Sequence, residues 1–144
     1  MVVRSWRSFI MFMFLLVGLL WVTFAPASAQ MSAEQEVASS GKPVFDQYCA
    51  QCHGRDGKGG GAASNLLTIK PADLTMISKK NNGTFPFWRI YSVIDGREDV
   101  KGHGSREMPI WGAEFRSQAA GSTVDQARGR ILELVYYLQS IQAK

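Results

Sequence analysis

The residues of this chain that could do chemistry are concentrated in one five-residue stretch, CAQCH. The chain has 2 cysteines and 2 histidines in 144 residues, and Cys49, Cys52 and His53 all lie in this stretch. Two cysteines separated by only two residues close a very small loop, so a bridge between them would stabilise the fold poorly. We therefore expect these three side chains to serve chemistry.

Cys-x-x-Cys-His is the spacing at which haem is attached covalently. Each thiol adds to one vinyl group of the haem, and two intervening residues on a helical turn let the two sulfur atoms reach neighbouring edges of the flat ring. His53, directly after Cys52, is then held beneath the iron, where a ring nitrogen can bind it. The spacing predicts one covalent haem on Cys49 and Cys52, with His53 as an iron ligand.

Two other chemistries use the same residue types. A Cys-x-x-Cys pair can be a dithiol redox centre, but that interpretation requires alternating strands and helices, and the sequence shows no clear strand pattern. His103 and the three CAQCH residues could also be counted as a zinc set. Neighbours such as Cys52 and His53 rarely converge on one tetrahedral ion, which favours haem.

Five segments, one of them containing CAQCH, carry a family resemblance. They are FDQYCAQCHGRDGKGGG, KPADL, IDG, MPIWG and LVYYLQSIQ. With them, residues 41–142 resemble a mono-haem class I cytochrome c of the bacterial periplasmic kind, and the first and fourth segments are the most specific. The resemblance implies an all-α fold: a small helical domain wrapped around one covalently attached haem c, with long glycine-containing loops.

The resemblance makes Met108 the second axial ligand, because the family uses the methionine of its Met-Pro motif. Met108 follows a polar, glycine-containing segment and is braced by a proline and an aromatic residue. Among the other candidates, Met76 suits a packing position and Met31 lies in a loose polar segment. His103 has the Gly-flanked setting of a solvated histidine.

The resemblance also implies roles around the iron ligands. A proline carbonyl after the glycine-rich loop, here that of Pro71, accepts the N–H of the proximal histidine and fixes its tautomer. Trp111 would donate its indole N–H to a haem propionate, with a plain core position as the alternative. The family's first and last helices cross through small and aromatic residues, whose counterparts here are Gly41, Phe45, Leu134 and Tyr137.

Sequence periodicity predicts the elements that position these residues. A short helix over residues 42–48, with Pro43 in its first turn, leads into CAQCH. A glycine-rich loop spans 54–65 and an extended segment spans 66–74. A helix over 85–94 ends at Asp95-Gly96. A last helix follows the capping-box pattern of Thr123 and Gln126, and its expected buried stripe is Val124, Ala127, Ile131, Leu134, Leu138 and Ile141.

The first 29 residues read as an export signal. Arg4 and Arg7 precede an apolar run over residues 9–24, and Ala27-Ser28-Ala29 fits a signal peptidase site. The run approaches the ~18 residues of a spanning helix, so an uncleaved membrane anchor is the alternative. We expect a signal at 1–29, a flexible leader at 30–41, a cytochrome c domain at 42–144, and a periplasmic location.

An iron with both axial positions filled has no open site for substrate, which predicts an electron carrier rather than an enzyme. We expect a monomer that meets redox partner proteins through the exposed haem edge in short-lived contacts. The alternatives are a membrane-tethered cytochrome, a small haem subunit of a dehydrogenase or oxidase complex, and a haem-based sensor or enzyme. The net charge of +4 falls to +2 without Arg4 and Arg7, which is too small to indicate nucleic acid. Membrane contact is expected only if the N-terminal segment is retained.

Overall fold

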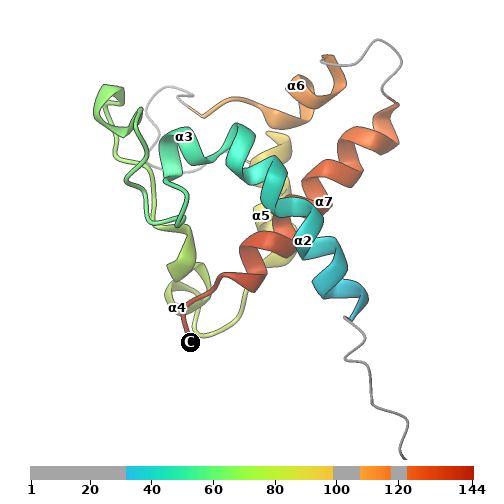
Figure 1. Ribbon diagram of the computed structural model, residues 1–144, viewed down its shortest axis with the longest axis horizontal. Helices are drawn as coiled ribbons and strands as arrows, with labels where there is room; N and C mark the ends of the chain where they lie inside the picture. The colour runs from blue at the N-terminus through green and yellow to red at the C-terminus, as the bar shows by residue number, and fades with distance from the viewer. Residues whose placement is uncertain (1–31, 99–107, 118–122) are drawn as a thin grey trace, which may run out of the picture. The chain divides into compact units, whose positions relative to one another are not determined.

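The computed structural model describes residues 32–98, 108–117 and 123–144, and this part of the chain is helical without strands. The α-helices are α2 (Ala33–Tyr48), α3 (Ala50–His53), α4 (Ile77–Lys80), α5 (Phe87–Asp95), α6 (Trp111–Ser117) and α7 (Val124–Ser140). Two 3₁₀ segments, η1 (Ser64–Leu66) and η2 (Leu74–Met76), complete it (Figure 1). The predicted all-α class is confirmed. The predicted signal lies outside the described residues.

Helix α2 begins well before the residue at which the sequence analysis placed it. The Ser32 side chain accepts from the Gln35 backbone N–H at 3.3 Å, and the Gln35 side chain accepts from the Ser32 N–H at 2.9 Å. This capping box starts a helix whose Ala38 and Gly41 are buried. The prediction of a flexible leader over 30–41 is therefore wrong for residues 33–41, and Pro43 lies inside the helix rather than in its first turn.

Helices α2 and α7 cross closely (Figure 1). A Cβ atom on Gly41 would overlap the carbonyl oxygen of Glu133 and would lie 2.8 Å from the Cβ of Tyr137. The rings of Phe45 and Tyr137 lie 5.1 Å apart, and Leu134 is buried beside them. Only glycine permits this approach, so the crossing expected from the resemblance is confirmed.

Helix α7 begins where the sequence predicted. Thr123 and Gln126 form the expected capping box. Four members of the predicted stripe are buried, namely Ala127, Ile131, Leu134 and Leu138. Val124 is 50 % exposed, because it lies in the first turn, ahead of the helix turns that contact the core. The prediction is wrong at that position.

Helix α5 begins two residues later than predicted and ends where expected. Tyr91 and Ile94 are buried, and Phe87 and Ile90 pack partly buried against the core. Gly96 terminates the helix with a φ of 86°, a left-handed conformation that glycine adopts without strain.

The segment after Pro71 contains two elements that the sequence analysis missed, η2 and α4. The side chain of Asp73 accepts from the Thr75 N–H at 2.9 Å and starts η2. The Gln142 side chain then donates to the Leu74 carbonyl and accepts from the Ser78 N–H, both at 2.8 Å. These bonds tie the C-terminal end of the chain to the segment that follows the glycine-rich loop. No helix among the described residues is long and apolar enough to cross a membrane.

Candidate functional site

The side chains that could hold haem lie on one short turn of helix directly after α2. They are Cys49, Cys52 and His53. Cys49 caps the end of α2, where its N–H donates to the Phe45 carbonyl at 2.9 Å. The His53 N–H donates to the Cys49 carbonyl at 2.9 Å, which closes α3. Cys49 and Cys52 are half-buried and are not joined by a disulfide. Helix α3 thus holds two thiols and one imidazole within a single turn, as the haem interpretation requires.

The imidazole of His53 is oriented by a backbone carbonyl of the segment after the glycine-rich loop. Its Nδ1 atom lies 3.1 Å from the carbonyl oxygen of Ala72. A proton on Nδ1 places the lone pair on Nε2, which is the form that binds a metal. Ala72 directly follows Pro71, the residue whose carbonyl was expected in this role, and the role of Pro71 stays a prediction. The Pro71 carbonyl faces Gly59, which has no side chain to keep it away.

Two cavities meet at CAQCH. The larger, of about 320 Å³, is walled mainly by apolar residues of α2, α5, α7 and the 72–77 segment. The smaller, of about 50 Å³, is lined by residues that include Cys52, Pro71 and Leu67. Four residues line both cavities: Cys49, His53, Met108 and Trp111. The predicted site residues are thus brought together around one largely apolar space, of the size that small cofactors occupy.

Met108 and Trp111 reach this space from the segment that leads into α6. Met108 is partly buried against the core. The Trp111 ring, on the first residue of α6, packs edge-on against Tyr48 at 5.5 Å and lies 5.7 Å from Phe115. Of the described methionines, Met76 lines neither cavity. Met31 and His103, the other candidates, lie outside the described residues.

The thiol environment differs from that of a reactive dithiol. Burial raises the pKa of the Cys49 thiol to about 12, and the neighbouring Cys52 contributes in the same direction. Redox-active Cys-x-x-Cys pairs have lowered thiol pKa values instead. In the described parts of the chain, no three His, Cys, Asp or Glu side chains are grouped to hold a metal ion. The dithiol alternative therefore finds no support, and the zinc set includes His103, which lies outside the described residues.

Three polar residues of the larger cavity were missed by the sequence analysis. Lys80, Asn81 and Arg89 line it together with Asp73 and a majority of apolar residues. Helical spacing could have indicated Arg89, since it lies three residues after Pro86 and four before Val93, and all three line the cavity.

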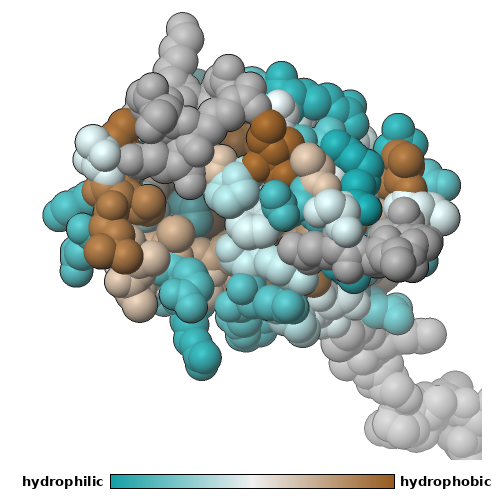
Figure 2. Space-filling view, turned by 90° about the horizontal axis from the view of Figure 1, so that it is seen from above, coloured by the Kyte–Doolittle hydropathy of each residue, from teal (hydrophilic) through white to brown (hydrophobic). Residues whose placement is uncertain are grey.

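The surface beside CAQCH carries exposed apolar side chains. Leu66 of η1 is 86 % exposed, the most of any large hydrophobic residue in the described chain. Figure 2 shows hydrophobic residues gathered on the left of this face, at the end of the molecule where Figure 1 places η1. Leu67 and Ile69 of the same segment line the smaller cavity, so this apolar surface continues into the site.

A helical domain that surrounds an apolar cavity with Cys-x-x-Cys-His on one helical turn is a c-type cytochrome domain. Residues 36–125 match the family described as cytochrome c oxidase, cbb3-type, subunit III. The match spans more than half of the chain, which therefore belongs to this family. No curated protein and no solved structure gave a significant match. As a cytochrome c domain, it carries a covalently bound c-type haem and serves haem-based electron transfer.

Proposed function

We propose that this protein is an exported, periplasmic electron carrier in which His53 and Met108 bind the haem iron. One observation carries the proposal: His53 and Met108, far apart in the sequence, line the same two cavities together with Cys49. The proposed domain organisation remains a signal over residues 1–29 followed by the exported cytochrome. We place the start of the cytochrome domain at α2 rather than at residue 42.

The residues present fit a covalent haem. Each of Cys49 and Cys52 can form one thioether bond: the sulfur bonds to a vinyl carbon, and the thiol proton goes to the other carbon of that vinyl group. The His53 ring is held by the Ala72 carbonyl so that Nε2 can bind iron. The apolar wall formed by residues such as Leu134 and Leu138 suits a large flat ring.

When bound, the haem iron supplies a one-electron ferric/ferrous couple. A neutral methionine thioether stabilises ferrous iron better than an anionic ligand would. The apolar cavity solvates the additional ferric charge poorly, so its walls act in the same direction. Both features of this chain favour a relatively high reduction potential. With His53 and Met108 both holding the iron, the chain would offer no place for substrate to bind it, which supports a carrier rather than an enzyme.

The polar residues of the larger cavity suit the carboxylates that a haem carries. Lys80 and Arg89 bring two positive charges to a mainly apolar wall that also holds the carboxylate of Asp73, and opposite charges in a partly desolvated setting attract strongly. Trp111 lines both cavities and offers an indole N–H. We assign the propionate contacts to these three residues.

Redox partners would dock over the apolar surface beside CAQCH, where Leu66 is exposed. Contacts used for electron transfer are small and short-lived, so a monomeric shuttle is the preferred form. The family description names an oxidase subunit, and this favours a second candidate: a permanent or membrane-tethered haem subunit of an oxidase complex. The two candidates share the same haem chemistry and differ in how the chain is retained.

An absorption spectrum of periplasmically expressed protein, oxidised and reduced, tests the proposal. We expect the spectrum of a low-spin c-type haem, with a weak far-red sulfur-to-iron band in the ferric form. The haem should resist acid–acetone extraction and add the mass of one haem to the chain. Haem that extracts freely, or ready binding of carbon monoxide by the reduced protein, would contradict the proposed attachment or the proposed ligation respectively.

A further inference from the structure

The C-terminal end of α5 packs closely against the start of α6 and the residue before it. A Cβ atom on Gly96 would overlap one methyl group of Ile110 and would lie 3.1 Å from two further atoms of the same side chain. A Cβ atom on Gly112 would overlap the carboxylate of Asp95 and would lie 2.8 Å from its carbonyl oxygen. Two glycines, one on each element, therefore permit a contact that side chains would prevent.

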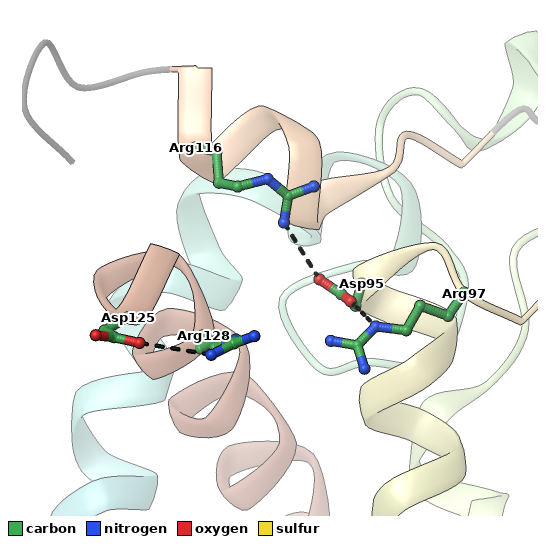
Figure 3. A network of polar contacts seen from close by, with 5 residues as sticks. All are labelled: Asp95, Arg97, Arg116, Asp125 and Arg128. Carbon is green, nitrogen blue, oxygen red and sulfur yellow. Dashed lines mark hydrogen bonds and ion pairs between the residues drawn. The ribbon is translucent and has the colours of Figure 1, made fainter. Parts of the chain in front are cut away.

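Asp95 is the buried charged residue of the described core, 7 % exposed. A carboxylate removed from water in this way is unfavourable unless it is paired. Two arginines pair with it (Figure 3): Nε of Arg97 with one carboxylate oxygen, and Nη1 of Arg116 with the other at 3.7 Å. Arg97 follows Asp95 by two residues on the same turn, whereas Arg116 belongs to α6.

Asp95 thus contacts α6 at two points on one face. Gly112 and Arg116 are four residues apart, so they lie one above the other on that helix. Gly112 places the α6 backbone against Asp95, and Arg116 forms an ion pair with the Asp95 carboxylate. Phe115, which is fully buried, fixes α6 to the core independently. The contacts of Asp95 therefore add to the orientation of a helix that is already anchored.

The chain segment that enters α6 is the one that carries Met108. Only two residues separate Met108 from Trp111, the first residue of α6, so the position of this helix limits where the methionine sulfur can lie. We propose that Asp95, Gly112 and Arg116 form a clasp that positions the Met108 segment over the haem site and slows replacement of the methionine by other ligands. This inference rests on the proposed ligation by Met108.

The test compares Arg116→Gln with Arg97→Gln in the haem-loaded protein. Both variants remove one arginine from Asp95, but only Arg116→Gln removes the ion pair between α5 and α6. The readout is the rate at which imidazole replaces the sixth ligand of the ferric protein, followed by loss of the far-red sulfur-to-iron band. Arg128→Gln, which breaks a separate pair with Asp125 at 3.5 Å (Figure 3), is a second control.

We expect Arg116→Gln to accelerate imidazole binding on the order of three- to fivefold, the effect of losing one partly exposed ion pair. Asp95→Asn should accelerate it at least as much, and Arg116→Lys should restore part of the wild-type rate. Arg97→Gln and Arg128→Gln should stay within about twofold of wild type, whatever they do to the free energy of unfolding.

If Arg116→Gln, Arg97→Gln and wild type bind imidazole at equal rates, the clasp proposal is wrong. The sulfur-to-iron band of the wild-type protein would still support ligation by Met108. A wild-type protein without that band would instead overturn the proposed ligation itself. The two failures are therefore distinguishable from the wild-type spectrum alone.

Discussion

At the scale of single residues, the site depends on hydrogen bonds to main-chain carbonyl groups. The Nδ1 atom of His53 lies 3.1 Å from the Ala72 carbonyl oxygen. The N–H of Cys49 donates to the Phe45 carbonyl. Since both of these carbonyls are main-chain groups, these two contacts should survive substitutions that spare the local backbone. Changes to the ligands themselves should therefore give clean effects.

Met108→Ala should open the sixth iron position. The far-red sulfur-to-iron band should disappear, the reduction potential should fall, and the reduced protein should bind carbon monoxide, because no other described methionine lines the cavities. Met76→Ala is the matched control, since Met76 lies on η2 away from them. Absorption spectra of both variants check this, and persistence of the band in Met108→Ala would remove this residue as the ligand.

Replacing Cys49 and Cys52 together by serine should yield little folded protein. The cavity that they border is about 320 Å³, and leaving such a space without its ring removes contacts from every residue of its wall. The yield and far-UV circular dichroism of periplasmically expressed protein check this. A double variant that folds as well as wild type would show that the helices hold together without the attached cofactor.

At the scale of elements, α7 carries the core. Its residues Ile131, Leu134 and Leu138 are buried, and Leu134 and Leu138 line the larger cavity. A glycine on α2 allows the two helices to cross at close range. The same helix therefore packs against protein on one side and faces the proposed haem cavity on the other, so its stability and haem retention should be coupled.

Leu138→Ala should lower the free energy of unfolding by about 2–5 kcal/mol, the range for a buried leucine. Val124→Ala is the control from the same predicted stripe, because Val124 is 50 % exposed, and it should change stability by less than about 0.5 kcal/mol. Denaturant unfolding of the haem-loaded variants, followed by haem absorbance and circular dichroism, measures both. Similar values for the two would mean that the Leu138 face does not carry the core.

At the scale of the whole molecule, the two candidate roles differ only in how the protein is retained. The described part of the cytochrome domain carries the haem site and an exposed apolar surface beside it, which would serve a shuttle and an oxidase subunit equally. The difference is decided by the first 29 residues, which lie outside the described structure, and by whether a partner stays bound.

Expression in a bacterial host with haem-attachment machinery should give a mature chain that starts at Gln30 and is found in the soluble periplasmic fraction. Cleavage after Ala29 is expected because the small residues at 27 and 29 suit signal peptidase. N-terminal sequencing and fractionation check this. An intact N-terminus in the membrane fraction would favour the tethered subunit and leave the haem chemistry unchanged.

The sequence by itself determined the chemistry and the helical class. CAQCH is a local motif whose spacing is fixed by the haem ring, so no tertiary information was needed to predict its role. The α7 cap and stripe were also local, because capping and helical periodicity act within a few residues. The end of α5 was indicated in the same way by Asp95-Gly96, as glycine adopts the left-handed terminating conformation.

Only the tertiary structure decided the features that depend on contacts between residues far apart in the sequence. The Ser32–Gln35 capping box that starts α2 is a local signal, but the packing of Gly41 against α7 is a long-range contact that no local pattern shows. The carbonyl that meets His53 belongs to Ala72 rather than Pro71, because the path of the chain past Gly59 turns the proline carbonyl away. The pairing of Asp95 with Arg116 joins residues that no local pattern relates. Spacing along the chain reports local geometry, whereas these contacts depend on how separate elements pack against one another.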